Sequence, residues 1–172
     1  MSAERFSLDA NVLFYAIDAN DPHRHRRAAE IVERAAVEYD CIIALQAYAE
    51  FFAAATRKEK MTIAEAGEQI ADWQTLFTTV YPAPGSLQQA IDAVAQHCLS
   101  FWDAMLWSVV KDAGGTVLLS EDLQDGRELG GVWFRNPFTP ADPFRTPHRG
   151  RVLSSDRASL RASKTPQGDA AR

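Results

Sequence analysis

The chain of 172 residues lacks the features that would place it in a membrane, on a secretory route or around a zinc ion. No window approaches the ~18 uninterrupted apolar residues of a membrane span, and no signal-type apolar block follows the first residues. Only two cysteines are present, Cys41 and Cys98, without the CxxC or Cys/His spacing of zinc ligands. We therefore expect a cytoplasmic protein that makes no membrane contact and whose cysteines are buried, reduced thiols.

The sequence also lacks an excess of positive charge, since its net charge is −5. An acidic protein is a poor match for nucleic acid, because phosphate binding normally needs a basic surface. The charge is unevenly distributed, however. Residues 1–138 hold 11 basic and 20 acidic residues, whereas residues 139–172 hold seven and three. The total therefore hides an acidic body and a basic end.

Apolar residues make up 47% of the chain, enough for one domain with its own core. After Phe138 the composition changes to four prolines, several serines and scattered apolar residues. Such a segment buries too little apolar surface to offset its conformational entropy. We predict a folded domain over residues 1–138 and a flexible, basic tail over 139–172.

Short apolar runs alternate with helical periodicity in the body of the chain. Thr62 and Glu65 form a capping-box pattern, and Gly114 ends another helical stretch. We expect strands over 6–9, 41–44, 116–119 and, at an edge, 132–134, and helices over 10–17, 23–38, 46–58, 62–79, 86–97 and 101–113. This alternation predicts an α/β protein, a three-layer α/β/α sandwich with a mostly parallel central sheet.

Three acidic residues stand alone in apolar surroundings. Asp9 is the only charged residue in 6–17, Glu50 the only one in 41–56, and Asp103 the only one in 99–110. A buried carboxylate without a partner is strongly unfavourable, or its pKa rises until it is neutral. Each of these groups therefore needs something to compensate it.

A fourth acidic group, which includes Asp122, follows the strand expected at 116–119, as Asp9 follows the first strand. Ligands of an open parallel sheet bind beyond the carboxyl ends of its strands. Two carboxylates from strand ends and two from helices, Glu50 and Asp103, can meet there. Oxygen donors without His or Cys suit Mg²⁺ or Mn²⁺ better than zinc.

Two of these acids also have a purely structural interpretation as helix caps. Asp9 can cap the helix at 10–17, and Asp103 can be the partner of Ser100 in a capping box. Neither pattern distinguishes a cap from a metal ligand when it is taken alone.

The remaining acids have other structural interpretations. Asp122 and Asp125 can be turn residues, and a protonated Glu50 can be satisfied by Gln46 or Tyr48. The four acids together are more specific than any one of them.

At these residues the sequence resembles PIN-domain ribonucleases, and most of all the VapC-type toxins of bacterial toxin–antitoxin pairs. The resemblance covers about residues 6–135 and lies in LDANVL at 8–13, QAYAEFF at 46–52, FWDA at 101–104 and LSEDLQDG at 119–126. It implies a Mg²⁺- or Mn²⁺-dependent endoribonuclease that forms homodimers and pairs with a small antitoxin. The catalytic and metal-binding acids that it implies are Asp9, Glu50, Asp103 and Asp122, supported by Asn11, Ser120 and Asp125.

The implied reaction is hydrolysis of an RNA phosphodiester by metal-activated water. We expect Asp9 and Asp103 to bind the metal directly. Glu50 and Asp122 then complete the shell through water or orient the attacking hydroxide. Because the ribose 2′-hydroxyl takes no part, the products should carry 5′-phosphate and 3′-hydroxyl ends.

Other functions remain open at this point: a non-catalytic PIN-like binding scaffold, or a PIN nuclease outside a toxin–antitoxin system. A phosphatase with Asp9 as nucleophile ranks low, because Asn11 stands where a second Asp would be required. If an antitoxin binds, we expect it to insert a basic side chain among the carboxylates and an amphipathic helix into an apolar groove.

Overall fold

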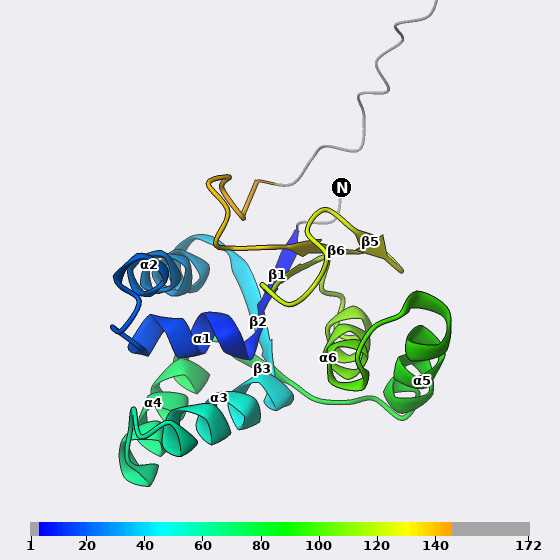
Figure 1. Ribbon diagram of the computed structural model, residues 1–172. Helices are drawn as coiled ribbons and strands as arrows, with labels where there is room; N and C mark the ends of the chain where they lie inside the picture. Colours follow the sequence, from blue (N-terminus) through cyan, green and yellow to red (C-terminus); the bar gives the residue numbers. More distant parts are fainter. Residues whose placement is uncertain (1–3, 146–172) are drawn as a thin grey trace, which may run out of the picture.

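The computed structural model describes residues 4–145, in which a six-stranded sheet lies between two layers of helices (Figure 1). The strands are β1 (Arg5–Leu8), β2 (Asp40–Ala44), β3 (Thr78–Val80), β4 (Val117–Leu119), β5 (Glu128–Leu129) and β6 (Val132–Arg135). The helices are α1 (Ala10–Ile17), α2 (Pro22–Glu38), α3 (Leu45–Arg57), α4 (Ile63–Leu76), α5 (Ser86–His97) and α6 (Phe101–Asp112).

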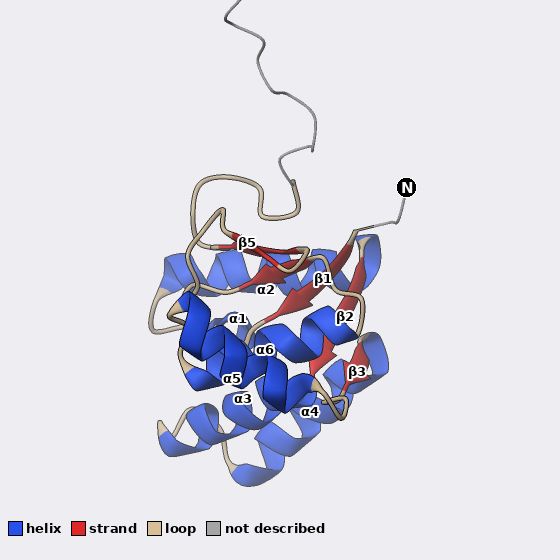
Figure 2. Ribbon diagram, turned by 90° about the vertical axis from the view of Figure 1, so that its right-hand side faces the viewer, coloured by secondary structure: helices blue, strands red, loops and turns tan. Residues whose placement is uncertain are grey.

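The two faces of the sheet are covered by different helices. Val117 and Leu119 pack into a core formed with residues of α1, α2, α3 and α4, whereas Leu118 between them packs with α5 and α6. This is the alternation expected of a strand that is buried on both faces. In Figure 2, α5 and α6 lie in front of the sheet and α1 and α2 behind it. The expected three-layer α/β/α architecture is therefore confirmed.

The strand order, β3-β2-β1-β4-β6-β5, places the site. From β1 the chain adds β2 and β3 on one side and β4 and β6 on the other, all in parallel pairs. The order thus reverses between β1 and β4. We call this place the switch point; ligands of open α/β sheets bind there. Leu8 pairs with Leu119 there, and the Asp9 N–H donates to the Leu119 carbonyl at 3.0 Å. The residues that follow these two strands therefore emerge side by side.

Two elements differ from the expectation at the sheet edges. The helix expected over 62–79 ends at Leu76, and Thr78–Val80 instead forms β3, parallel to β2. Its β-branched residues suit a strand, and the open edge of β2 supplies the partner. The strand at 132–135 is not an edge, because β5 pairs with it antiparallel across Gly130 and Gly131. Both glycines have positive φ, 56° and 88°, as a two-residue hairpin turn requires.

The cysteine expectation holds for one of the two residues. Cys41 is buried on β2, whereas Cys98 is exposed. Cys98 ends α5 in a left-handed conformation, with a φ of 56°, and so belongs to the connection to α6 rather than to the core. Over residues 4–145, no helix has the length and apolarity that crossing a bilayer requires.

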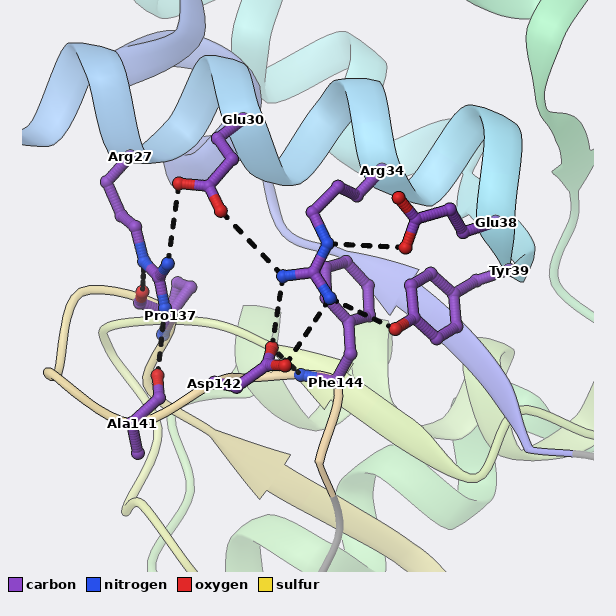
Figure 3. A network of polar contacts seen from close by, with 9 residues as sticks. All are labelled: Arg27, Glu30, Arg34, Glu38, Tyr39, Pro137, Ala141, Asp142 and Phe144. Carbon is purple, nitrogen blue, oxygen red and sulfur yellow. Dashed lines mark hydrogen bonds and ion pairs between the residues drawn. The ribbon is translucent and has the colours of Figure 1, made fainter.

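The folded part of the chain extends beyond the boundary expected at 138. Phe144 is only 4% exposed, because its ring stacks on Tyr39 with the centroids 4.1 Å apart. Arg34 of α2 lies over the same ring and pairs with Asp142 at 3.2 Å (Figure 3). Arg27 donates to the carbonyls of the same segment, at Pro137 and Ala141. Residues 139–145 therefore pack against α2. The rest of the expected tail, 146–172, lies outside the described residues.

Candidate functional site

Asp9 combines the two interpretations that its sequence position allows. It is the N-cap of α1, with Oδ1 accepting the Ala10 N–H at 2.6 Å. Its other oxygen, Oδ2, accepts the Ser120 hydroxyl at 2.6 Å from the end of β4. Because the side chain is only 5% exposed, these bonds replace much of the hydration that the carboxylate loses. One oxygen therefore starts the helix, and the other faces the switch point.

The electrostatic surroundings of Asp9 bring the acids of the site together. Burial raises the pKa of Asp9 from 3.8 to about 7, against the opposing effect of the bonds from Ser120 and Ala10. The charges of Glu50 and Asp122 raise the pKa further. Both residues therefore lie within electrostatic reach of Asp9. A carboxylate that holds a proton near neutrality is what one expects of a cation ligand without its cation.

Asn11 links the two strand ends. Its Nδ2 donates to Asp9 Oδ2 at 3.2 Å and to Asp122 Oδ2 at 3.1 Å, and it lies 3.4 Å from the Ser120 hydroxyl. The Asp122 N–H completes the network by donating to the Ser120 hydroxyl at 3.1 Å. The Asn11 Oδ1 is buried and has no hydrogen-bond partner within residues 4–145. The amide nitrogen faces the two carboxylates, and the unsatisfied Oδ1 of the same group can accept a hydrogen bond or bind a cation.

Glu50 reaches the site from α3 and is held by Gln46. The Gln46 Nε2 donates to Glu50 Oε1 at 2.7 Å and to the Trp102 carbonyl at 2.9 Å. The first bond is the one that a structural interpretation of Glu50 requires. The second ties α3 to the beginning of α6, so Gln46 also fixes the two helices that carry Glu50 and Asp103.

Asp103 lies in the first turn of α6, where the capping interpretation is also present. The Ser100 hydroxyl accepts the Asp103 N–H at 3.2 Å and donates to its Oδ2 at 2.7 Å. Burial raises the pKa of Asp103, the Ser100 bond lowers it, and the charge of Asp122 raises it again, with a net increase. Asp103 is therefore electrostatically coupled to Asp122, as Asp9 is.

Asp125 is engaged elsewhere. Its Oδ1 accepts the Asn136 N–H at 2.9 Å and lies 3.5 Å from the Arg135 Nε. These contacts hold the loop after β4 against the end of β6. The structure does not bring Asp125 into the network around Asp9, and its carboxylate has a structural task.

Glu121 is a neighbour of the site that sequence reasoning left out. It pairs with Arg24 of α2 at 2.9 Å, and the guanidinium lies over the rings of Tyr15, at 4.8 Å, and Phe138, at 5.5 Å. Arg24 also donates to the Tyr15 hydroxyl. Because Glu121 stands between Ser120 and Asp122, this anchor fixes the turn that carries both. The sequence shows only an acidic run and a basic run, 97 residues apart.

The donor set suits a hard divalent cation with water in its shell. In the described range, no three side chains of the types His, Cys, Asp and Glu are grouped closely enough to hold one metal ion. Mg²⁺ commonly binds one or two carboxylates directly and keeps several waters. The buried carboxylate of Asp9, the amide oxygen of Asn11 and the neighbouring acids offer only oxygen ligands. This arrangement suits an ion that binds one or two carboxylates directly and keeps water in the rest of its shell. It suits less well an ion that all four acids would bind directly.

The fold resembles solved structures of bacterial proteins at low sequence identity. VapC20 of Mycobacterium tuberculosis, described as a sarcin–ricin loop cleaving toxin, is 18% identical, with a TM-score of 0.54 over 66% of this chain and 86% of its own. VapBC2 of Rickettsia felis, solved with a promoter DNA fragment, is 11% identical, with a TM-score of 0.56 over 77% and 98%. VapBC-1 of nontypeable Haemophilus influenzae is 13% identical, with a TM-score of 0.56 over 78% and 99%.

Comparison with curated protein sequences gives no match. The model of the PIN domain, however, matches residues 7–124. That range begins within β1 and ends just beyond Asp122, so it contains the switch point and each acid of the network described above. The match spans more than half of the sequence, and the chain belongs to the PIN-domain family.

Proposed function

We propose that the protein is a Mg²⁺- or Mn²⁺-dependent endoribonuclease that acts as the toxin of a type II toxin–antitoxin pair. The observation that carries the proposal is the network of Asp9, Asn11, Ser120 and Asp122 at the switch point. Glu50 on α3 lies within electrostatic range of Asp9, and Asp103 on α6 lies within electrostatic range of Asp122. Four acids without a basic partner in the described chain favour a metal-dependent reaction on phosphate.

Each side chain of the site has a task in the proposed reaction. Asp9 and Asp103 would bind the metal, with Glu50 and Asp122 completing its shell, in part through water. When bound, a divalent cation neutralises phosphate charge and lowers the pKa of a coordinated water. Gln46 occupies one oxygen of Glu50, so Oε2 is left to accept a proton from the attacking water. Ser120 and Asn11 keep Asp9 and Asp122 in place.

RNA as the substrate is supported by the family and by one similar structure. VapC20 of Mycobacterium tuberculosis is described as a toxin that cleaves the sarcin–ricin loop. We propose the same class of substrate for this chain, without assigning a particular RNA. Because the ribose 2′-hydroxyl has no role in the reaction, cleavage should leave 5′-phosphate and 3′-hydroxyl ends.

We expect the purified protein to cleave RNA in the presence of Mg²⁺ or Mn²⁺, and we expect cleavage to stop when EDTA removes the metal. Asp9→Asn and Asp103→Asn keep the size of each side chain, and we expect either one to lower kcat by a factor of at least about 100, because each removes a charge at the metal. Circular dichroism would verify that both variants are folded, and mapping of the RNA ends would test the chemistry. Activity that survives EDTA or both substitutions would contradict the proposal.

We also propose an antitoxin as partner and a homodimer as the assembly. Similar structures are VapBC assemblies, and a mainly apolar cavity of about 370 Å³ lies beside Glu50. Its lining includes Ala49, Ala53 and Trp102, and Trp102 is 63% exposed. An amphipathic helix that places apolar side chains in this cavity would bring a basic side chain to the acids.

The antitoxin proposal predicts that a small protein is encoded next to this gene and binds this chain. Trp102→Ala should weaken the complex with this antitoxin about tenfold or more, because it removes an exposed aromatic anchor.

Light scattering of the isolated protein tests the homodimer. Tight binding to a partner without any affinity for Mg²⁺ would instead identify a non-catalytic scaffold.

A further inference from the structure

A second cavity, of about 400 Å³, opens on the other side of Glu50. It lies between α1 and α3, and its rim includes Asn11 of the acid network. From there it continues along α3 to Arg57 and Lys58. One cavity therefore joins the acids of the site to two basic side chains.

Charge is separated along this cavity. Glu50 and Arg57 are seven residues apart on α3, which places them on one face and about 10 Å apart along the helix axis. In the described part of the chain, neither Arg57 nor Lys58 has an acidic partner within 4.0 Å. The neighbouring Lys60, in contrast, pairs with Asp18 at 3.1 Å. The cavity thus has an acidic end, at Glu50, and a basic end, at Arg57 and Lys58, of which Lys58 also lies within electrostatic range of Asp18. The other acid in its lining, Glu121, is paired with Arg24.

The walls between the two ends leave room for a nucleoside. Ala53, which is exposed, and Ala54 form the α3 side and present only methyl groups. Tyr15 forms part of the opposite wall, and its ring is held by Arg24 at 4.8 Å. A rigid aromatic wall facing small residues accepts a base without restricting its identity.

The position of Arg57 at the end of a helix explains only part of this arrangement. A cation in the last turn of α3 is favourable for the helix dipole, and Lys58 lies over the Phe14 ring at 4.4 Å. Neither effect requires a cavity that connects these cations to Glu50. Binding of an RNA strand would use such a cavity, because the scissile phosphate and the next phosphate are separated by one nucleoside.

We propose that this cavity binds the ribonucleotide adjacent to the cleavage point, with Arg57 and Lys58 holding its far phosphate. The inference rests on the proposed nuclease function, and it adds a binding site outside the acid network. It makes the two basic residues determinants of KM and of substrate length.

The test compares Arg57→Gln and Lys58→Gln in the full chain with Arg26→Gln, which removes an exposed charge from α2 outside the cavity. Cleavage of a labelled single-stranded RNA gives KM and kcat. Binding of the same RNA to the Asp9→Asn form of each protein gives the salt dependence. Arg57→Gln and Lys58→Gln should each raise KM about tenfold at unchanged kcat and reduce the slope of log K against log salt by about 0.7. Arg26→Gln should change neither quantity.

A second pair of variants tests the cavity by shape instead of charge. Ala53→Leu fills it from an exposed position, and Ala64→Leu makes the same change on the exposed face of α4. Only Ala53→Leu should raise KM. The effect of Arg57→Gln should also disappear with an RNA shortened on one side of the cleavage point, because that RNA lacks the far phosphate.

The two proposals fail in different ways. Absence of metal-dependent cleavage by the wild-type protein would overturn the nuclease function. Normal cleavage together with an unchanged KM and an unchanged salt slope in Arg57→Gln and Lys58→Gln would overturn the nucleotide site alone. A loss of thermal stability in Arg57→Gln with normal RNA binding would assign the residue to the helix end and likewise overturn it.

Discussion

The proposed reaction requires Asp9 to be ionised, whereas the burial of Asp9 in the fold favours its neutral form. Burial makes the ionised form of the carboxylate unfavourable and raises its pKa to about 7, and Glu50 and Asp122 add repulsion. Yet the same carboxylate must be ionised to bind a cation. The metal-free protein therefore carries strain at this residue that a bound metal ion would relieve. Functional residues commonly reduce stability in this way.

Asp9→Asn should therefore stabilise the protein in EDTA. The folded pKa of Asp9 is raised above its usual 3.8, so the folded state binds more protons than the unfolded state between about pH 4 and 7. The contribution of this group to stability falls as pH rises through that window. At pH 8 the full pKa difference applies, at about 1.4 kcal/mol per unit, so the variant should exceed the wild type by up to about 4 kcal/mol, and the gain should vanish near pH 4. Urea unfolding at both pH values measures this difference.

Mg²⁺ provides the control for this prediction. The wild type should gain stability when Mg²⁺ is added at pH 8, because the ion binds only the folded state. Asp9→Asn should gain much less, since its first ligand is gone. A variant that is less stable than the wild type at pH 8 would show that the Ala10 and Ser120 bonds matter more than burial.

At the scale of the element, the sequence predicts what local chemistry determines. The capping box of Thr62 and Glu65 starts α4 as expected, with the Glu65 carboxylate accepting the Thr62 N–H at 2.7 Å. The isolation of Asp9 and Glu50 in apolar runs likewise indicates that neither acid is an ordinary surface charge. In both cases the decisive neighbours lie within a few residues along the chain.

Features that depend on distant partners are not predictable in this way. Residues 78–80 form β3 because β2 offers a free edge, and the sequence around Leu76 gives no sign that a strand follows. Phe144 is an isolated aromatic in a proline-rich stretch until Tyr39 and Arg34 form its binding site. Glu121 acquires its role only through Arg24. The candidate site was therefore predictable as a set of acids, but not its anchors.

The segment after β6 provides a prediction at this scale. Phe144→Ala should destabilise the protein by about 3 kcal/mol and lower Tm by roughly 10 °C, because it empties a buried aromatic site. A chain that ends at residue 138 should lose at least as much. A chain that ends at 145 keeps every contact described here and serves as the control. Equal stability of chains that end at 138 and at 145 would restore the boundary at Phe138.

Asp142 makes a smaller and pH-dependent contribution to the same attachment. Burial raises the pKa of Asp142, but bonds from Arg34 and the Phe144 N–H outweigh this effect and lower it overall. A lowered pKa stabilises the fold above the unfolded value and is lost as pH falls through the folded one. Asp142→Asn should cost about 0.5 kcal/mol at pH 7, since the pair is partly exposed, and nothing near pH 2.

At the scale of the whole molecule, the net charge of −5 describes no particular surface. Asp9 and Asp122 are joined by Asn11 where β1 and β4 end, whereas Arg57 and Lys58 line the adjoining cavity at its other end. In the proposed site, an RNA strand would be repelled by the acids and attracted by the basic end. A divalent cation at the acids would make the local field far less negative.

This arrangement predicts an unusual dependence of RNA affinity on Mg²⁺. For a protein that binds RNA through basic residues alone, Mg²⁺ competes for phosphates and weakens binding. Here Mg²⁺ should strengthen binding about tenfold at constant ionic strength, because it reduces the repulsion between the acids and the RNA phosphates. Fluorescence anisotropy with Glu50→Gln, which is expected to prevent cleavage, measures the affinity. The double variant Asp9→Asn, Asp122→Asn should bind RNA in EDTA more tightly than Glu50→Gln does and should respond to Mg²⁺ as an ordinary basic protein would. If Mg²⁺ weakens binding in both, the acids do not face the RNA, and a role for them in holding its phosphates is lost.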